Sequence, residues 1–131
     1  MKNKFGFILV KPQLGENIGA CARSMKNFGF TNLHIVSPKI NFPNHKAKVT
    51  SVGALDIINK AKVFNETNEA ISNFDTIVSL SARRRDINKR HISLNNFVKL
   101  LKKTKNSNFG LMFGPEASGL SNEDLSFSNY V

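Results

Sequence analysis

Short apolar runs and amphipathic stretches alternate along this 131-residue chain. Each apolar run is long enough for one buried strand, and each amphipathic stretch repeats its apolar residues at helical spacing. Such alternation is typical of a mainly parallel sheet with helices on both faces. We therefore predict an α/β fold in a single domain, with strands at 5–10, 33–36, 63–64, 76–80 and 109–113, helices at 17–28, 47–60, 66–74, 94–103 and 123–125, and the start of another strand at 129–131.

Three loops at the expected carboxyl ends of strands could hold a ligand, because parallel sheets bind ligands at that edge. They are 11–17, 81–85 and 114–119. The last, GPEASG, contains two glycines and a proline, which end the strand and leave backbone N–H and C=O groups open to a ligand. Glu116 is its one carboxylate. An ordinary strand-to-helix turn with an exposed glutamate fits these residues equally well.

The helix predicted at 17–28 carries two candidate functional side chains at its start and middle. Asn17 is predicted as its N-cap residue, because its side chain can accept a hydrogen bond from the first turn. Apolar residues then recur at helical spacing, and they are Ile18, Cys21, Ala22, Met25 and Phe28. Cys21 lies on this stripe and is interpreted as a core residue. Arg23 lies away from the stripe, so periodicity alone favours a solvated arginine.

The net charge of the chain is +10 at pH 7, which suits a polyanionic partner such as nucleic acid. Clustering strengthens this interpretation, since basic residues gather after the expected fourth strand and on the following helix, at Arg83, Arg84, Arg85, Lys89, Arg90, Lys99, Lys102, Lys103 and Lys105. The alternative is a compositional habit, because asparagine is also frequent in this chain.

Several classes of site and location are excluded by the sequence. A lone cysteine rules out a disulfide within the chain and a multi-cysteine metal site. The three histidines are scattered without ligand spacing, so no metal is predicted. Residues 15–19, GENIG, match no phosphate-binding loop. No apolar run approaches membrane-spanning length, and the N-terminus has no secretory signal, so we interpret the protein as cytoplasmic.

Three segments, in the right order and spacing, resemble a known family. Residues 17–29, NIGACARSMKNFG, are similar to motif 1 of the SpoU/TrmH class of SPOUT RNA methyltransferases. Residues 111–125, LMFGPEASGLSNEDL, are similar to motif 2 of that class. Between them, residues 78–83, VSLSAR, resemble the strand-end segment of the TrmJ-like branch. Together the three matches cover most of the chain.

The resemblance implies transfer of a methyl group from S-adenosylmethionine to RNA, most often to a ribose 2′-hydroxyl of tRNA and otherwise of rRNA. It also implies a homodimer and a sheet whose C-terminal part is threaded into a trefoil knot. By matched position the cofactor would contact, largely through backbone groups, Leu80, Ser81, Ala82 and Gly114. The active site would contain Asn17, Arg23 and Glu116, and RNA phosphates would contact Arg83 and Arg85.

Within this resemblance the roles of the charged residues follow from their chemistry. Arginine keeps its proton at neutral pH, so we expect Arg23 to act as a fixed cation rather than as a base. It would grip the phosphate beside the target ribose and stabilise the charge that develops as the hydroxyl loses its proton. Glu116 is expected to anchor loops or to orient Asn17 and Arg23.

The chain departs from the family pattern in one respect. Motif 3, a strand followed by a Ser-Leu-Asn segment and a long helix, is not found before Val131. We therefore expect residues 1–131 to be a SpoU-type methyltransferase domain that lacks its C-terminal knot segment, is inactive alone and exposes apolar surface where the last helix would pack. A non-catalytic basic α/β module that holds RNA is the alternative, and an unrelated α/β domain is a third possibility.

Overall fold

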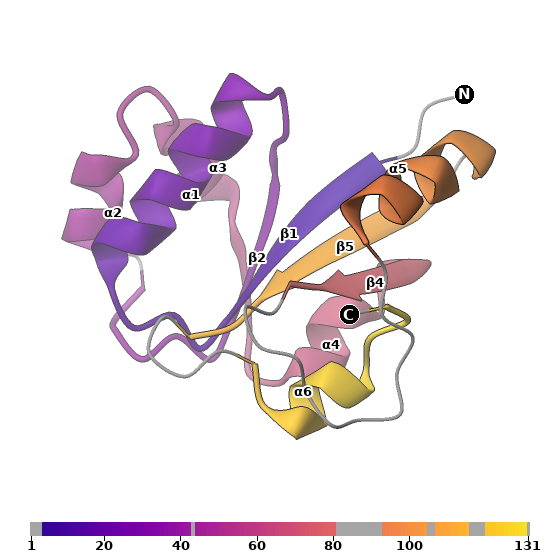
Figure 1. Cartoon of the computed structure of the whole chain (residues 1–131). Helices are drawn as coiled ribbons and strands as arrows, with labels where there is room; N and C mark the ends of the chain where they lie inside the picture. Colours follow the sequence, from indigo (N-terminus) through magenta and orange to yellow (C-terminus); the bar gives the residue numbers. More distant parts are fainter. Residues whose placement is uncertain (1–3, 43, 81–92, 105–106, 116–119, 131) are drawn as a thin grey trace.

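The computed structural model describes residues 4–42, 44–80, 93–104, 107–115 and 120–130 (Figure 1). Five strands and six helices follow one another along these residues, where the sequence predicts five strands and five helices. In chain order they are β1 (Lys4–Val10), α1 (Gly15–Asn27), β2 (Asn32–Val36), α2 (His45–Thr50), α3 (Leu55–Lys60), β3 (Lys62–Phe64), α4 (Thr67–Ile71), β4 (Thr76–Ser79), α5 (Leu94–Lys103), β5 (Asn108–Phe113) and α6 (Asn122–Ser126).

The strands form one parallel sheet in the order β3-β2-β1-β5-β4, so the predicted fold class is confirmed. The chain builds outward from β1 to β3, crosses over to β4, and returns to place β5 beside β1. The connections therefore diverge between β1 and β5. In open α/β sheets this switch point, at the carboxyl ends of the strands, is where ligands bind.

On one face of the sheet, α1 and α3 bury an apolar cluster against β2. The outer side of α1 lies close to α2 and the residue before it, because two positions there are glycines. A Cβ at Gly19 would meet the hydroxyl of Thr50 and the backbone carbonyl of Ala47, and a Cβ at Gly15 would meet the side chain of Asn44. Farther along the same face, Phe97 of α5 packs edge-on against Phe109, near the start of β5.

On the other face, α4 and α6 cover a second cluster that includes Ile8, Val10 and Met112. Buried polar groups join these two helices, which lie near one another beneath the sheet in Figure 1. The Asp124 carboxylate of α6 accepts hydrogen bonds from the hydroxyls of Thr67, at the start of α4, and Ser121. This connection fixes the segment that follows the glycine-rich loop.

Two predicted details differ from the structure. Helix α1 begins at Gly15, with Leu14 at its N-cap position and no side-chain cap, so the prediction that Asn17 caps this helix is wrong. The helix predicted at 47–60 is broken into α2 and α3, because residues 51–53 form a turn and Gly53 has a positive φ of 81°. Asn44 caps α2 by accepting a hydrogen bond from the Ala47 N–H.

The predicted strand start near residue 129 is confirmed. Tyr130 forms a parallel bridge with Val78 on the outer edge of β4, and the Ser79 N–H donates to the Tyr130 carbonyl. In the described part of the chain, no helix has the length and apolar character required to cross a membrane.

Candidate active site

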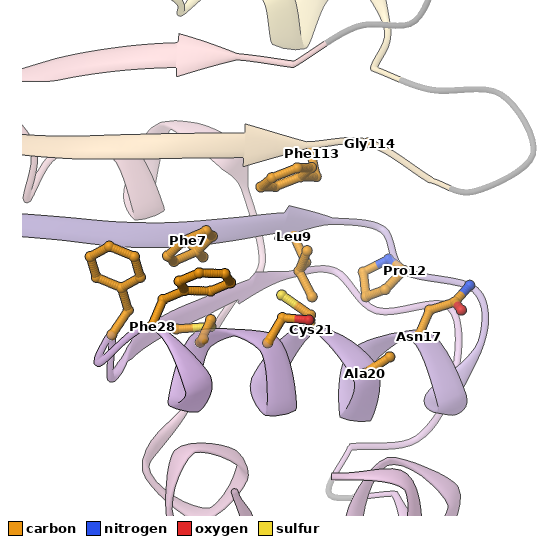
Figure 2. A pocket seen from close by; sticks show the side chains of 12 residues that line it. Phe7, Leu9, Pro12, Asn17, Ala20, Cys21, Phe28, Phe113 and Gly114 are labelled. Carbon is orange, nitrogen blue, oxygen red and sulfur yellow. The ribbon is translucent and has the colours of Figure 1, made fainter. Parts of the chain in front are cut away.

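An apolar groove of about 520 Å³ lies between α1 and the sheet floor of β1 and β5. Figure 2 shows side chains of α1 and of the two strands pointing toward one another across it. The lining residues are Phe7, Leu9, Pro12, Asn17, Ala20, Cys21, Ser24, Met25, Phe28, Phe30, Phe113 and Gly114. The groove therefore runs along the β1–β5 switch point.

The two ends of this groove differ in chemistry. At one end Phe28, at the end of α1, is 77% exposed and stands near Phe7 (Figure 2). At the other end, Asn17 and Gly114 lie at the carboxyl edge of the sheet beside Pro12 (Figure 2). The groove is an exposed apolar surface, and the expectation that a C-terminal helix packs on such a surface stays a prediction. The end with Asn17 and Gly114 brings together residues from the two segments that resemble motifs 1 and 2.

Leu80 and Gly114, two residues predicted to contact a cofactor, follow neighbouring strands. Ser79 of β4 pairs in register with Met112 of β5, so the two strand ends are about 4.8 Å apart. The Leu80 N–H donates to the Met112 carbonyl at 2.9 Å, and its side chain is 46% exposed. This adjacency fits a ligand held by backbone groups of both loops. The other predicted contact residues, Ser81, Ala82, Arg83, Arg85 and Glu116, lie outside the described residues.

Arg23 is exposed, as its helical position predicts, and is not part of the groove. It follows Asn17 by six residues, which rotates it about 120° around the axis of α1 from Asn17. Asn17 faces the groove while Arg23 points to solvent on the side of α1 nearer α2. The structure thus brings together Asn17, Gly114 and Leu80 but does not bring Arg23 to them within one chain.

Cys21 lies on the side of the groove formed by α1. It packs against the apolar cluster of α1, as predicted for a core residue, but it is only partly buried and also lines the groove. Burial raises the pKa of its thiol to about 11. Such a thiol stays protonated at neutral pH and is a poor nucleophile, so this cysteine contributes an apolar surface. Among the described residues, no cluster of histidine, cysteine, aspartate or glutamate could hold a metal ion.

The family model of the SpoU rRNA Methylase family matches residues 4–131. This match spans both signature segments and every described strand and helix. The chain belongs to the SpoU rRNA methylase family.

Curated relatives of this SpoU chain include an archaeal and a bacterial protein. The tRNA (cytidine-2'-O-)-methyltransferase TrmJ of Methanocaldococcus jannaschii is 36% identical over 121 residues, which are 90% of this chain and 52% of the relative. The uncharacterized tRNA/rRNA methyltransferase LasT of Escherichia coli K12 is 36% identical over 126 residues, or 95% of this chain and 55% of the relative. The chain thus spans about half the length of these relatives.

Solved structures of the family superpose well on this chain. TrmJ from Z. mobilis ZM4 has a TM-score of 0.88 and 33% identity, covering 95% of this chain and 56% of that one. The SpoU methyltransferase AviRb from Streptomyces viridochromogenes in complex with AdoMet has a TM-score of 0.68 over 99% of this chain and 50% of its own, and at 18% identity it supports the fold alone. The SPOUT-type fold class is therefore shown.

Sequence reasoning missed the groove floor formed by Phe7, Leu9 and Phe113. In β1, apolar residues point to both faces of the sheet, a pattern that predicts burial on both sides. Nothing in that pattern distinguishes a face covered by a helix from one left open. Phe28, which is 77% exposed in the structure, was assigned to the core because it follows the helical spacing of the apolar residues.

Proposed function

We propose that the complete protein carrying this SpoU chain is an S-adenosylmethionine-dependent RNA methyltransferase that modifies a ribose 2′-hydroxyl of tRNA in the cytoplasm. One observation carries the proposal. The two signature segments meet at the carboxyl edge of the sheet, where Asn17 of α1 and Gly114, the residue after β5, line the same end of one groove. The names of the relatives, which are tRNA and tRNA/rRNA methyltransferases, point to the same chemistry.

The residues at this edge have distinct proposed roles. When bound, S-adenosylmethionine supplies a methyl group on a sulfonium centre. Backbone groups of the loops that begin at Leu80 and Gly114 would hold the cofactor, together with Ser81 and Ala82. Glycine at 114 leaves that loop open to close approach. Asn17 is exposed and lines the groove, and its amide would orient the ribose, because positioning contributes heavily to an in-line transfer.

Arg23 reaches such a site only from a second copy of the chain. Because Arg23 and Asn17 point about 120° apart on α1, a groove formed by one copy has no Arg23 beside it. We therefore propose a homodimer in which the Arg23 guanidinium of one copy faces the Asn17 end of the other. There it would bind the phosphate next to the target ribose and stabilise the developing oxyanion. Glu116 would anchor the loop that carries it.

The open groove supports a further part of the proposal. A Phe28 side chain that is 77% exposed beside an apolar floor is the surface that a packed helix or partner covers. We propose that residues 1–131 are an incomplete methyltransferase domain, that a further segment completes the knot and the cofactor pocket, and that this chain alone is inactive.

Radiolabelled methyl transfer to tRNA by the complete protein tests the proposal. Asn17→Ala and Arg23→Ala should each abolish transfer while the circular dichroism spectrum stays unchanged. Mixing the two inactive variants under conditions of subunit exchange should restore about a quarter of wild-type activity, because half of the dimers are mixed and one of their two sites is intact. Arg23→Lys tests whether the bidentate hydrogen bonding of the guanidinium is needed in addition to its charge.

Three results would contradict the proposal in different ways. Full activity of Arg23→Ala removes the assigned role of that residue. Loss of activity in both variants without recovery on mixing contradicts the two-copy site. Salt-sensitive RNA binding without uptake of S-adenosylmethionine, measured by calorimetry, would identify the alternative function, a non-catalytic basic RNA-binding module.

A further inference from the structure

A second hollow, here called the polar hollow, opens at the carboxyl ends of β1, β2 and β3. It has a volume of about 250 Å³ and is separate from the apolar groove. Its lining residues are Lys11, Val36, Asn65, Glu66, Thr67, Asn68, Glu123 and Phe127. They come from the strand ends and from α4 and α6, which cover the opposite face of the sheet from α1 (Figure 1).

The backbone at the rim of the polar hollow is strained. Among the described residues, Lys11 and Ser37 are the non-glycine positions with positive φ, at 50° and 41°. Each directly follows a strand, and each N–H donates to the last carbonyl of the next strand, from Lys11 to Val36 at 2.7 Å and from Ser37 to Phe64 at 2.8 Å. Such conformations are unfavourable for side-chain-bearing residues and persist where the surrounding structure holds them. They turn the chain out of the sheet and fix the position of Lys11.

Polar side chains around the hollow have unused hydrogen-bonding capacity. Lys11, Glu66, Asn68 and Glu123 form no side-chain hydrogen bond or ion pair in the described part of the chain, where the one ion pair is Lys26–Asp56. By contrast, Thr67 at the bottom of the hollow is buried and bonded to Asp124. At the bottom of the hollow the polar side chain is thus hydrogen-bonded, whereas the carboxylate, amide and ammonium groups at its rim are available to a ligand.

The size and chemistry of the polar hollow favour one flat heterocycle. Its volume is below the range of about 300–1,000 Å³ typical of pockets for whole small molecules. Two carboxylates, Glu66 and Glu123, accept hydrogen bonds from amino groups and repel phosphate. Phe127 offers a ring for stacking, and Lys11 can bind a phosphate at the rim. A nucleotide would therefore enter base first, with its phosphate outside.

The polar hollow is also close to the proposed reaction site. Leu9 of β1 pairs in register with Phe113 of β5, so Lys11 and Gly114 follow adjacent strand ends about 4.8 Å apart. One RNA strand can therefore contact both strand ends. We propose that the polar hollow binds an unpaired nucleobase that carries an exocyclic amino group, as a recognition subsite of the RNA substrate. This inference rests on the proposed function.

Binding of two hexanucleotides to the complete protein tests the subsite. Oligocytidylate and oligouridylate hexamers have the same charge and ring size, but only cytosine has an amino group. Fluorescence anisotropy at fixed salt should show oligocytidylate binding about fivefold tighter or more, the lower end of discrimination by one base contact. Nitrogen-resolved NMR should show shifts of the Asn65 and Asn68 side-chain amides with oligocytidylate.

Charge-removing variants inside and outside the hollow locate the effect. Glu66→Gln and Glu123→Gln should reduce the preference toward equality. Glu69→Gln, on the same helix α4 but outside the hollow, should retain it. Lys11→Ala should weaken both hexamers equally and lower the salt dependence by about one phosphate contact.

Equal binding of the two hexamers by the wild type, or a preference that survives both glutamate variants, would overturn the inference. The proposed function can fail separately. If the protein transfers no methyl group to tRNA but still prefers oligocytidylate in a way that depends on Glu66, the proposed function is wrong and the subsite is supported. If the protein transfers methyl groups to tRNA but binds both hexamers equally, the proposed function is supported and the subsite is wrong.

Discussion

The hydroxyl of Thr67 donates a hydrogen bond of 2.8 Å to Oδ1 of Asp124, 57 positions farther along the chain. The bond is buried and joins α4 to α6. Ser121 donates to the other carboxylate oxygen at 3.0 Å, so both oxygens of a side chain that is only 8% exposed are used. Since α6 is the first helix after the glycine-rich loop, this carboxylate determines where the chain resumes after that loop.

Asp124→Ala should lower the free energy of unfolding by about 2–3 kcal/mol, because it removes two hydrogen bonds to a charged group and leaves the buried Thr67 hydroxyl unpaired. Urea denaturation measures the change. Its neighbour Glu123 is exposed, so Glu123→Ala should change stability by less than about 0.5 kcal/mol. Equal effects of the two substitutions would show that the network contributes nothing specific.

Gly19→Ala should separate α1 from α2. The added methyl group would lie 2.5 Å from the backbone carbonyl of Ala47 and closer still to the Thr50 hydroxyl, so a backbone must move. Overpacking of this kind costs about 1–3 kcal/mol, which thermal and urea unfolding would detect. Arg23→Ala, on the exposed side of the same helix, is the matched control and should be nearly neutral. A stabilised Gly19→Ala variant would contradict the close helix contact.

Protonation of His34 should destabilise the fold in mild acid. Its ring is 1% exposed between Phe64 and Phe74. Nε2 forms a hydrogen bond with Asn32 Oδ1 at 2.9 Å, and Nδ1 has no hydrogen-bond partner among the residues that the structure describes. Burial, with a smaller effect of Lys62, lowers the pKa of His34 from 6.5. The stability that depends on the neutral ring is complete above about pH 6.5 and is lost as pH falls through the lowered pKa.

The measurement is the free energy of unfolding between pH 5 and 8. The fall below pH 6.5 should be smaller in His34→Gln, which cannot be protonated in this range. His45→Gln, at an exposed histidine, should retain the wild-type profile. A wild-type profile that is flat from pH 5 to 8 would rule out the role of His34.

The thiol of Cys21 should react slowly with iodoacetamide. With its pKa raised to about 11 by burial, its thiolate fraction at pH 8 is roughly two hundredfold below that of an exposed cysteine with a pKa near 8.5. Mass spectrometry gives the alkylation rate. Ala20→Cys in a Cys21→Ser background moves the thiol to an exposed neighbouring position and should react at nearly the free rate. A native Cys21 as fast as that control would contradict its partial burial.

Much of this fold follows from local patterns in the sequence. Helix α5 occupies the predicted residues 94–103, and β5 begins one residue before its predicted start at Phe109. The strand order was not predictable, because the pairing of β1 with β5 joins segments about a hundred residues apart and leaves no local signal. The start of α1 was missed because Gly15 is a poor helix former, and its place in the helix depends on contact with Asn44 of another segment.

The sequence singled out two residues of the apolar groove but did not predict the geometry of the groove, and the roles assigned to the site residues stay predictions. The two signature segments placed Asn17 and Gly114 together, and the groove contains both. Helical periodicity correctly put Arg23 in solvent, whereas the resemblance put it in the active site. Both statements hold only if the site is shared between two copies, a relation that the sequence of one chain does not express. The polar hollow was missed because its residues come from four separate segments of the chain.

The apolar groove has a practical consequence for experiments on this chain. The groove has Phe7 and Leu9 at its floor and the exposed Phe28 at its side. Environment-sensitive dyes such as anilinonaphthalene sulfonate can therefore bind there in the native state. Bright dye fluorescence from the folded protein would therefore indicate an open apolar groove and not a molten globule. Unfolding of this chain should accordingly be followed by near-ultraviolet dichroism or hydrogen exchange.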